Sequence, residues 1–186
     1  MHKYLTLVVL VFASAANADW TVTEDDGKTT ATLHNTITPD DGSNVPEADH
    51  YHVNSPGGSV WAGVKIMKAL KGKSVSYTMA YSAAAMIATE LGATPASDKA
   101  TLGFHWSAYP EGMEVGPEEA KYLTAMNAQM LKSMKKSLAP ALAAYIIDQM
   151  NGFKDNDQGL SMIFYSVKTN RSSTIVDGEL TDQKAH

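Results

Sequence analysis

A Pro-Gly-Gly segment lies between a short strand pattern and an amphipathic helix pattern. Residues 49–53 favour a strand, and they are followed by Asn54-Ser55-Pro56-Gly57-Gly58-Ser59. Apolar residues then recur at helical spacing on one side, at Val60, Val64, Met67 and Leu70. Adjacent glycines at such a junction let main-chain N–H groups approach a ligand closely. These groups can hold a developing oxyanion, although the same residues also make an ordinary turn.

Strand patterns alternate with helix patterns along most of the chain. Strands are expected at residues 20–23, 29–33, 36–38, 49–53, 75–80 and 102–106, with a turn at Asp25-Asp26-Gly27. Helices are expected at residues 60–70 and 82–91, from Pro117 to about residue 136, and at 140–150. After Asn151 the pattern is weak. This alternation predicts an α/β fold with a mostly parallel sheet.

Composition excludes several classes of protein. The chain has 186 residues, a net charge of −5 and no cysteine. Without cysteine there can be no disulfide scaffold, no thiolate zinc site and no cysteine nucleophile. The acidic balance argues against nucleic-acid binding, because there is no basic surplus to neutralise phosphates. The length fits a single domain.

The N-terminus has the pattern of a secretory signal peptide. Lys3 precedes a short apolar run at residues 5–13, and small residues follow up to Ala16-Asn17-Ala18. The run is too short to span a bilayer, so a lasting membrane anchor is not expected. We therefore predict a signal peptide at residues 1–18 and a single mature domain at residues 19–186. The protein is expected to be exported, to the periplasm in a Gram-negative host.

Ser82 and His105 are candidates for nucleophilic catalysis. Ser82 lies where the strand at 75–80 gives way to a helix of small residues, so a helix N-terminus and the Ala83 N–H could stabilise an oxyanion there. The same serine could instead only cap the helix. His105 lies on the apolar strand at residues 102–106. It would be a general base if its ring reached the nucleophile, and otherwise a core histidine.

These motifs resemble those of the ClpP-like serine peptidases of the ClpP/crotonase superfamily, in particular the exported members that lack an ATPase. The resemblance covers residues 49–106 and consists of the Asn-Ser-Pro-Gly-Gly-Ser-Val segment, Ser82 on its small-residue helix, and Gly103-Phe104-His105. It implies repeated β-β-α units around a mostly parallel sheet. It also implies a serine endopeptidase that acts on extended or unfolded polypeptide and commonly forms homo-oligomers. No metal or organic cofactor is implied.

The resemblance assigns roles to individual residues. Ser82 would be the nucleophile and His105 the base, and the N–H groups of Gly58 and Ala83 would bind the oxyanion. The third catalytic residue would be Asp157, which precedes a Leu-Ser step as the family's aspartate does; Asp155 and Asp148 are its competitors. Few residues are available before the Pro-Gly-Gly segment, so the family's first helix is expected to be shortened or missing.

Other functions are compatible with the same residues. A shifted alignment would place Ala85-Met86 at the nucleophile position and leave a catalytically inactive peptide-binding module. A Ser–Lys dyad of signal-peptide-peptidase type would use Lys121 as its base, if burial lowered the pKa of that lysine. An acyl-CoA enzyme of the crotonase branch would need no Ser82, but this chain lacks the length and basic groups of a CoA pocket.

Two further patterns have both a structural and a functional interpretation. His50 and His52 would share one face of a strand, but no third metal ligand is evident nearby, so strand packing is favoured over a metal site. Met126, Met130 and Met134 recur every four residues on the long helix. They predict a core stripe, or alternatively an oligomer interface.

Overall fold

The computed structural model describes residues 20–106, 116–154, 162–166, 170–176 and 179–185. These residues form one nine-stranded sheet and four helices, which confirms an α/β fold. The first half contains β1 (Trp20–Asp25), β2 (Lys28–Ile37), β3 (His50–Gly58), α1 (Val60–Ala69), β4 (Ser74–Tyr81), α2 (Ala83–Leu91), β5 (Thr94–Pro95) and β6 (Thr101–Phe104). The second half contains α3 (Pro117–Ser137), α4 (Pro140–Lys154), β7 (Met162–Ser166), β8 (Arg171–Val176) and β9 (Glu179–Ala185).

The sheet is mixed rather than mostly parallel. Its order is β1-β2-β3-β4-β6-β7-β8-β9, with β5 paired beside β4. The central strands β2, β3, β4 and β6 are parallel, whereas β1 and the run from β7 to β9 are antiparallel to their neighbours. The parallel pairs are joined by crossovers through helices or long loops. Few residues separate the antiparallel neighbours β1 and β2, β7 and β8, and β8 and β9, whereas the antiparallel pair β6–β7 is joined through α3 and α4.

The C-terminal strands were not expected from the sequence. Only β7 is strongly apolar, with Met162, Ile163 and Tyr165 buried, while β8 and β9 are rich in Ser, Thr and charged residues. Their alignment comes from main-chain pairing onto β7, which leaves little periodicity in the sequence.

The strands before α1 also differ from expectation. β2 is one continuous strand with a bulge at Asn35, whose φ of 53° explains the break between its two apolar stretches. β3 does not end at Val53 but continues through the Pro-Gly-Gly segment, where Gly57 and Gly58 pair with Thr36 and Ile37. Residues 38–49 between the two strands form turns and contain no helix, as expected for a shortened or missing first helix.

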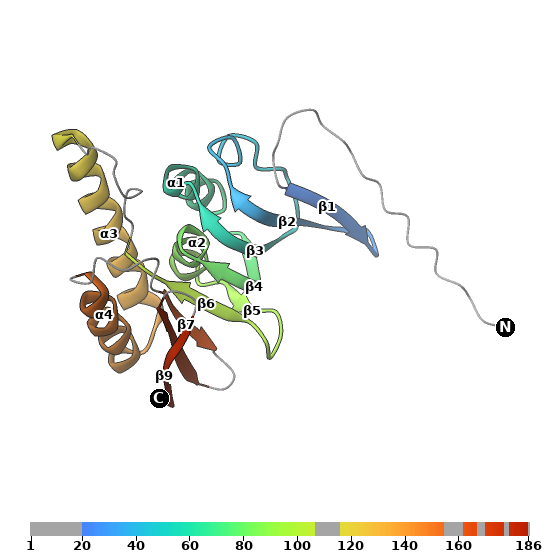
Figure 1. The fold of residues 1–186 in the computed structure, drawn as a ribbon. Coiled ribbons are helices and arrows are strands. Elements are labelled where there is room, and N and C mark those ends of the chain that lie inside the picture. Colours follow the sequence, from blue (N-terminus) through green and yellow to red (C-terminus); the bar gives the residue numbers. More distant parts are fainter. Residues whose placement is uncertain (1–19, 107–115, 155–161, 167–169, 177–178, 186) are drawn as a thin grey trace.

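The helices lie along one side of the sheet (Figure 1). The core is formed between that side and the inner faces of α1 and α2, where Leu33, Val53, Ile66 and Ile87 are fully buried. α3 packs against α2 through Met130 and Met134, which are 4% and 0% exposed, so these two methionines belong to the core stripe. Among the described helices, none has both the length and the apolar character needed to cross a membrane.

Candidate active site

Ser82 occupies a strained turn between β4 and α2. Its φ of 54° and ψ of −122° fall in a region that a residue with a side chain rarely adopts, at a cost of about 1–3 kcal/mol. The Ser82 N–H donates to the Gly103 carbonyl at 2.8 Å, which fixes the turn to the end of β6. Although Ser82 stands at the N-cap position, its side chain makes no capping hydrogen bond. The hydroxyl is therefore available for another partner.

That partner is His105, the residue that follows β6. Its Nε2 lies 2.7 Å from Ser82 Oγ. The contact is possible because β4 and β6 are neighbouring parallel strands, in which Tyr81 pairs with Gly103. The structure thus brings together two candidates that are separated along the chain by the whole of α2.

The other ring nitrogen of His105 identifies the tautomer. His105 Nδ1 lies 2.7 Å from the Trp106 carbonyl oxygen, which can only accept a hydrogen bond. Nδ1 must therefore carry the proton, and the neutral ring presents the Nε2 lone pair to the Ser82 hydroxyl. Burial lowers the pKa of His105, and the hydrogen bond to Trp106 partly opposes this shift. Because the net shift of the pKa is downward, the imidazole is neutral at pH 7, as a general base requires.

Trp106 is itself held in place. Its indole Nε1–H donates to the Met150 carbonyl oxygen on α4 at 2.8 Å, and Met150 is fully buried. Trp106, whose carbonyl accepts the proton on His105 Nδ1, is thus anchored to α4, a helix that is distant from it along the chain. Nothing in the amino-acid pattern signals this role, because it belongs to a main-chain carbonyl that every residue has.

Gly57 brings the Pro-Gly-Gly segment into contact with the Ser82 turn. A Cβ on Gly57 would lie 2.5 Å from the Tyr81 carbonyl oxygen, 2.6 Å from Ser82 Cβ and 3.1 Å from the Ala83 nitrogen. The φ of Gly57 is 99°. Both the space and the backbone conformation therefore require glycine here.

The N–H groups beside Gly58 already have acceptors. Gly57 N–H donates to Ser55 Oγ at 3.1 Å, and Ser59 N–H donates to the Ile37 carbonyl of β2 at 2.8 Å. Ala83 is the first residue of α2, and its N–H is one of the helix-end donors with no acceptor within the helix.

Other candidate residues lie elsewhere or outside the described residues. Asp157 and Asp155 both fall in the part of the chain that is not described, and Asp148 is exposed on α4. Lys121 is exposed and pairs with Glu118 at 2.6 Å, so it lacks the burial that a lysine base needs. Ala85 and Met86 are buried within α2, which favours Ser82 over the shifted alignment.

His50 and His52 form a hydrogen-bonded chain with hydroxyl groups on β4. Their ring nitrogens lie between 2.7 and 3.1 Å from the side-chain oxygens of Ser74, Ser76 and Thr78. Within the described ranges, no three His, Cys, Asp or Glu residues are grouped so that they could hold a metal ion. The two histidines are therefore involved in cross-strand packing between β3 and β4.

Comparison with protein-family models and with curated proteins gives no match to this chain. The functional interpretation therefore depends on the residues and their geometry.

Proposed function

We propose that this protein is an exported serine peptidase of ClpP-like fold that hydrolyses peptide bonds in extended or unfolded polypeptide. The observation that carries the proposal is the 2.7 Å approach of Ser82 Oγ to His105 Nε2 at a strained strand-to-helix turn. A serine in such a turn, next to a neutral imidazole, has the arrangement of an activated nucleophile.

The reaction would proceed in two stages. Ser82 Oγ attacks the peptide carbonyl carbon while its proton passes to His105 Nε2. The negative charge on the carbonyl oxygen is stabilised by the N–H groups of Gly58 and Ala83. The imidazolium then gives its proton to the leaving amine as the peptide bond breaks. In the second stage the same ring takes a proton from water, which attacks the acyl carbon, and returns that proton to Ser82 Oγ as the ester bond breaks. During both stages the Trp106 carbonyl accepts from Nδ1 and stabilises the charged ring.

The test is covalent labelling of the mature protein with a fluorophosphonate probe. We expect labelling of the wild type, loss of labelling in Ser82→Ala, and labelling slowed by a factor of about 10² to 10⁴ in His105→Ala, because general-base assistance is worth that much. The rate of cleavage of a quencher-labelled unfolded polypeptide should likewise be highest for the wild type, much lower for His105→Ala and absent for Ser82→Ala. A wild type that is not labelled between pH 6 and pH 9 would show instead a catalytically inactive peptide-binding module.

Assembly into homo-oligomers is a second part of the proposal, carried by the resemblance to the family. Trp61 on α1 is 56% exposed and stands 6.2 Å from Tyr122 of α3, ring centre to ring centre. Sedimentation velocity of the mature protein would test assembly, and a purely monomeric species at micromolar concentration would contradict it.

A further inference from the structure

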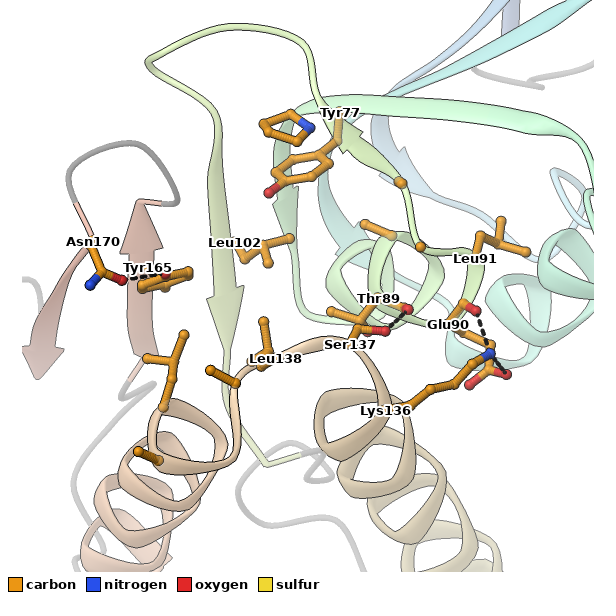
Figure 2. Close-up of a pocket in the computed structure, with 17 residues that line it drawn as sticks. Tyr77, Thr89, Glu90, Leu91, Leu102, Lys136, Ser137, Leu138, Tyr165 and Asn170 are labelled. Carbon is orange, nitrogen blue, oxygen red and sulfur yellow. Dashed lines mark hydrogen bonds and ion pairs between the residues drawn. The ribbon is translucent and has the colours of Figure 1, made fainter. Parts of the chain in front are cut away.

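A pocket lies at the end of α2 that is remote from Ser82 (Figure 2). Its volume is about 630 Å³, within the range of small-molecule sites. α2 has nine residues, so its two ends are about 13 Å apart. The pocket is therefore separate from the candidate active site, and a ligand could occupy it whether or not Ser82 is a nucleophile.

The walls of the pocket are largely apolar. Small and aliphatic side chains come from the end of α2, from β6 and from the corner between α3 and α4: Ala88, Leu91, Ala93, Leu102, Leu138, Leu142. The corner is tied to α2 by two hydrogen bonds, from Ser137 Oγ to the Thr89 carbonyl and from Lys136 Nζ to the Glu90 carbonyl. The pocket is thus preformed rather than dependent on a ligand for its shape.

Tyr77 supplies a hydroxyl group for which no partner exists among the described residues. The residue is only 3% exposed, and Figure 2 shows its hydroxyl directed toward the cavity on the side of Leu102. The neighbouring phenol differs, because Tyr165 donates to Asn170 Oδ1 at 2.8 Å. Burying a hydroxyl without a partner is unfavourable, so a polar atom of a ligand is the expected complement.

The charges around the pocket limit what can bind. Burial, together with the nearby Tyr165, raises the pKa of Tyr77 to about 12, so its phenol remains a hydrogen-bond donor at physiological pH. At the mouth, Lys136 Nζ and Glu90 Oε1 are paired at 3.2 Å and offset each other's charge. The site thus offers one buried donor, apolar walls and no net charge at its entrance.

We propose that this pocket binds a small, uncharged and largely apolar molecule whose carbonyl oxygen accepts a hydrogen bond from the Tyr77 hydroxyl. The test uses prodan, a neutral naphthalene ketone whose fluorescence shifts to the blue when it leaves water. Titration of the mature protein should give saturable binding. A parent dimethylaminonaphthalene without the ketone serves as a second probe.

Three variants make the test specific. Tyr77→Phe keeps the ring and removes the hydroxyl, so it should weaken prodan binding about threefold to tenfold, the usual value of one hydrogen bond. Binding of the ketone-free probe should not change in this variant. Ala141→Trp, at the exposed rim of the pocket, should block both probes, whereas Tyr122→Phe outside the pocket should affect neither.

Circular dichroism would establish that each variant is folded. The proposal is overturned if the wild type shows no saturable binding, if Tyr77→Phe binds prodan as tightly as the wild type, or if Ala141→Trp leaves binding unchanged. None of these outcomes involves Ser82, so they cannot be confused with failure of the proposed peptidase activity.

Discussion

At the residue scale, the candidate active site consists of two side chains and one main-chain carbonyl. Ser82, His105 and the Trp106 carbonyl form a continuous line of hydrogen bonds with distances of 2.7 Å. A carboxylate is the usual acceptor for the base of such a site, and Asp157 is the sequence candidate for it. Because Nδ1 has a single proton, and the Trp106 carbonyl already accepts it, we expect that catalysis depends more on Trp106 than on Asp157.

Substitution of Trp106 tests this expectation. Trp106→Phe keeps an aromatic ring but loses the indole N–H that anchors the residue to Met150. The His105 ring should become less well oriented, so kcat or the fluorophosphonate labelling rate should fall about threefold to tenfold with little change in KM. Since the Trp106 hydrogen bond raises the pKa of His105, the acid limb of the pH profile should also move to lower pH.

Trp20→Phe is the matched control for this change. Trp20 also donates its indole N–H to a main-chain carbonyl, that of Asp41 at 3.3 Å, but on β1. The Trp20→Phe variant should leave both the fluorophosphonate labelling rate and its pH profile unchanged. The expectation is wrong if Asp157→Ala slows labelling as much as His105→Ala while Trp106→Phe has no effect.

At the scale of elements, the site depends on three parallel strands that end at nearly the same place. β3 ends in the Pro-Gly-Gly segment, β4 leads into Ser82 and β6 into His105. The carboxyl ends of parallel strands are the usual location of sites in α/β sheets. Close contact between these ends is possible only because Gly57 has no side chain.

Gly57→Ala should therefore disturb both the stability of the protein and the candidate active site. The added methyl group would overlap the Tyr81 carbonyl and Ser82, so the strand ends must move apart. Gly27→Ala is the matched control, because Gly27 also has a positive φ, 74°, but open space around it.

Urea unfolding should show a loss of about 1 kcal/mol for Gly27→Ala, from backbone conformation alone. The loss for Gly57→Ala should be larger by at least about 2 kcal/mol, as expected for overpacking. Labelling of Ser82 should fall only in Gly57→Ala. Equal losses of stability in the two variants would show that the contact with the Ser82 turn is unimportant.

At the scale of the whole molecule, we expect two partly buried histidines, His52 and His105, to make stability depend on pH. Burial lowers the pKa of His105, and burial together with His50 and His34 lowers the pKa of His52. In the unfolded chain both groups would have ordinary pKa values near 6.5. Between the lowered and the ordinary values the unfolded state binds more protons, so stability is lost as pH falls through this range.

The free energy of unfolding should therefore decrease from pH 7.5 to pH 5.5, as measured in urea. Carboxyl groups with lowered pKa, such as Asp49 and Glu90, act at lower pH and do not interfere. The double variant His52→Gln, His105→Gln should show a much smaller decrease. A wild type that becomes more stable toward pH 5.5, or a double variant with the same decrease, would contradict the assignment.

Much of the fold could be predicted because its signals are local. The helical spacing from Val60 to Leu70 and the small-residue helix after Ser82 depend on neighbours along the chain, and both helices are present as α1 and α2. The strands β8 and β9 could not be predicted, because main-chain pairing onto an existing sheet leaves no periodic pattern. The sequence pattern likewise predicted two strands, at residues 29–33 and 36–38, where the structure has the single strand β2, because the bulge at Asn35 interrupts the pattern.

The sequence by itself determined the α/β class, the strand-to-helix junctions and the candidacy of Ser82 and His105. Only the tertiary structure decided that these two side chains meet, since their contact requires β4 and β6 to pair as neighbours after the chain has crossed over through α2. It also decided the acceptor for His105 Nδ1 and the pocket that contains the Tyr77 hydroxyl. Both depend on α4 and the α3–α4 corner packing against distant segments, and such contacts leave no trace in local sequence patterns.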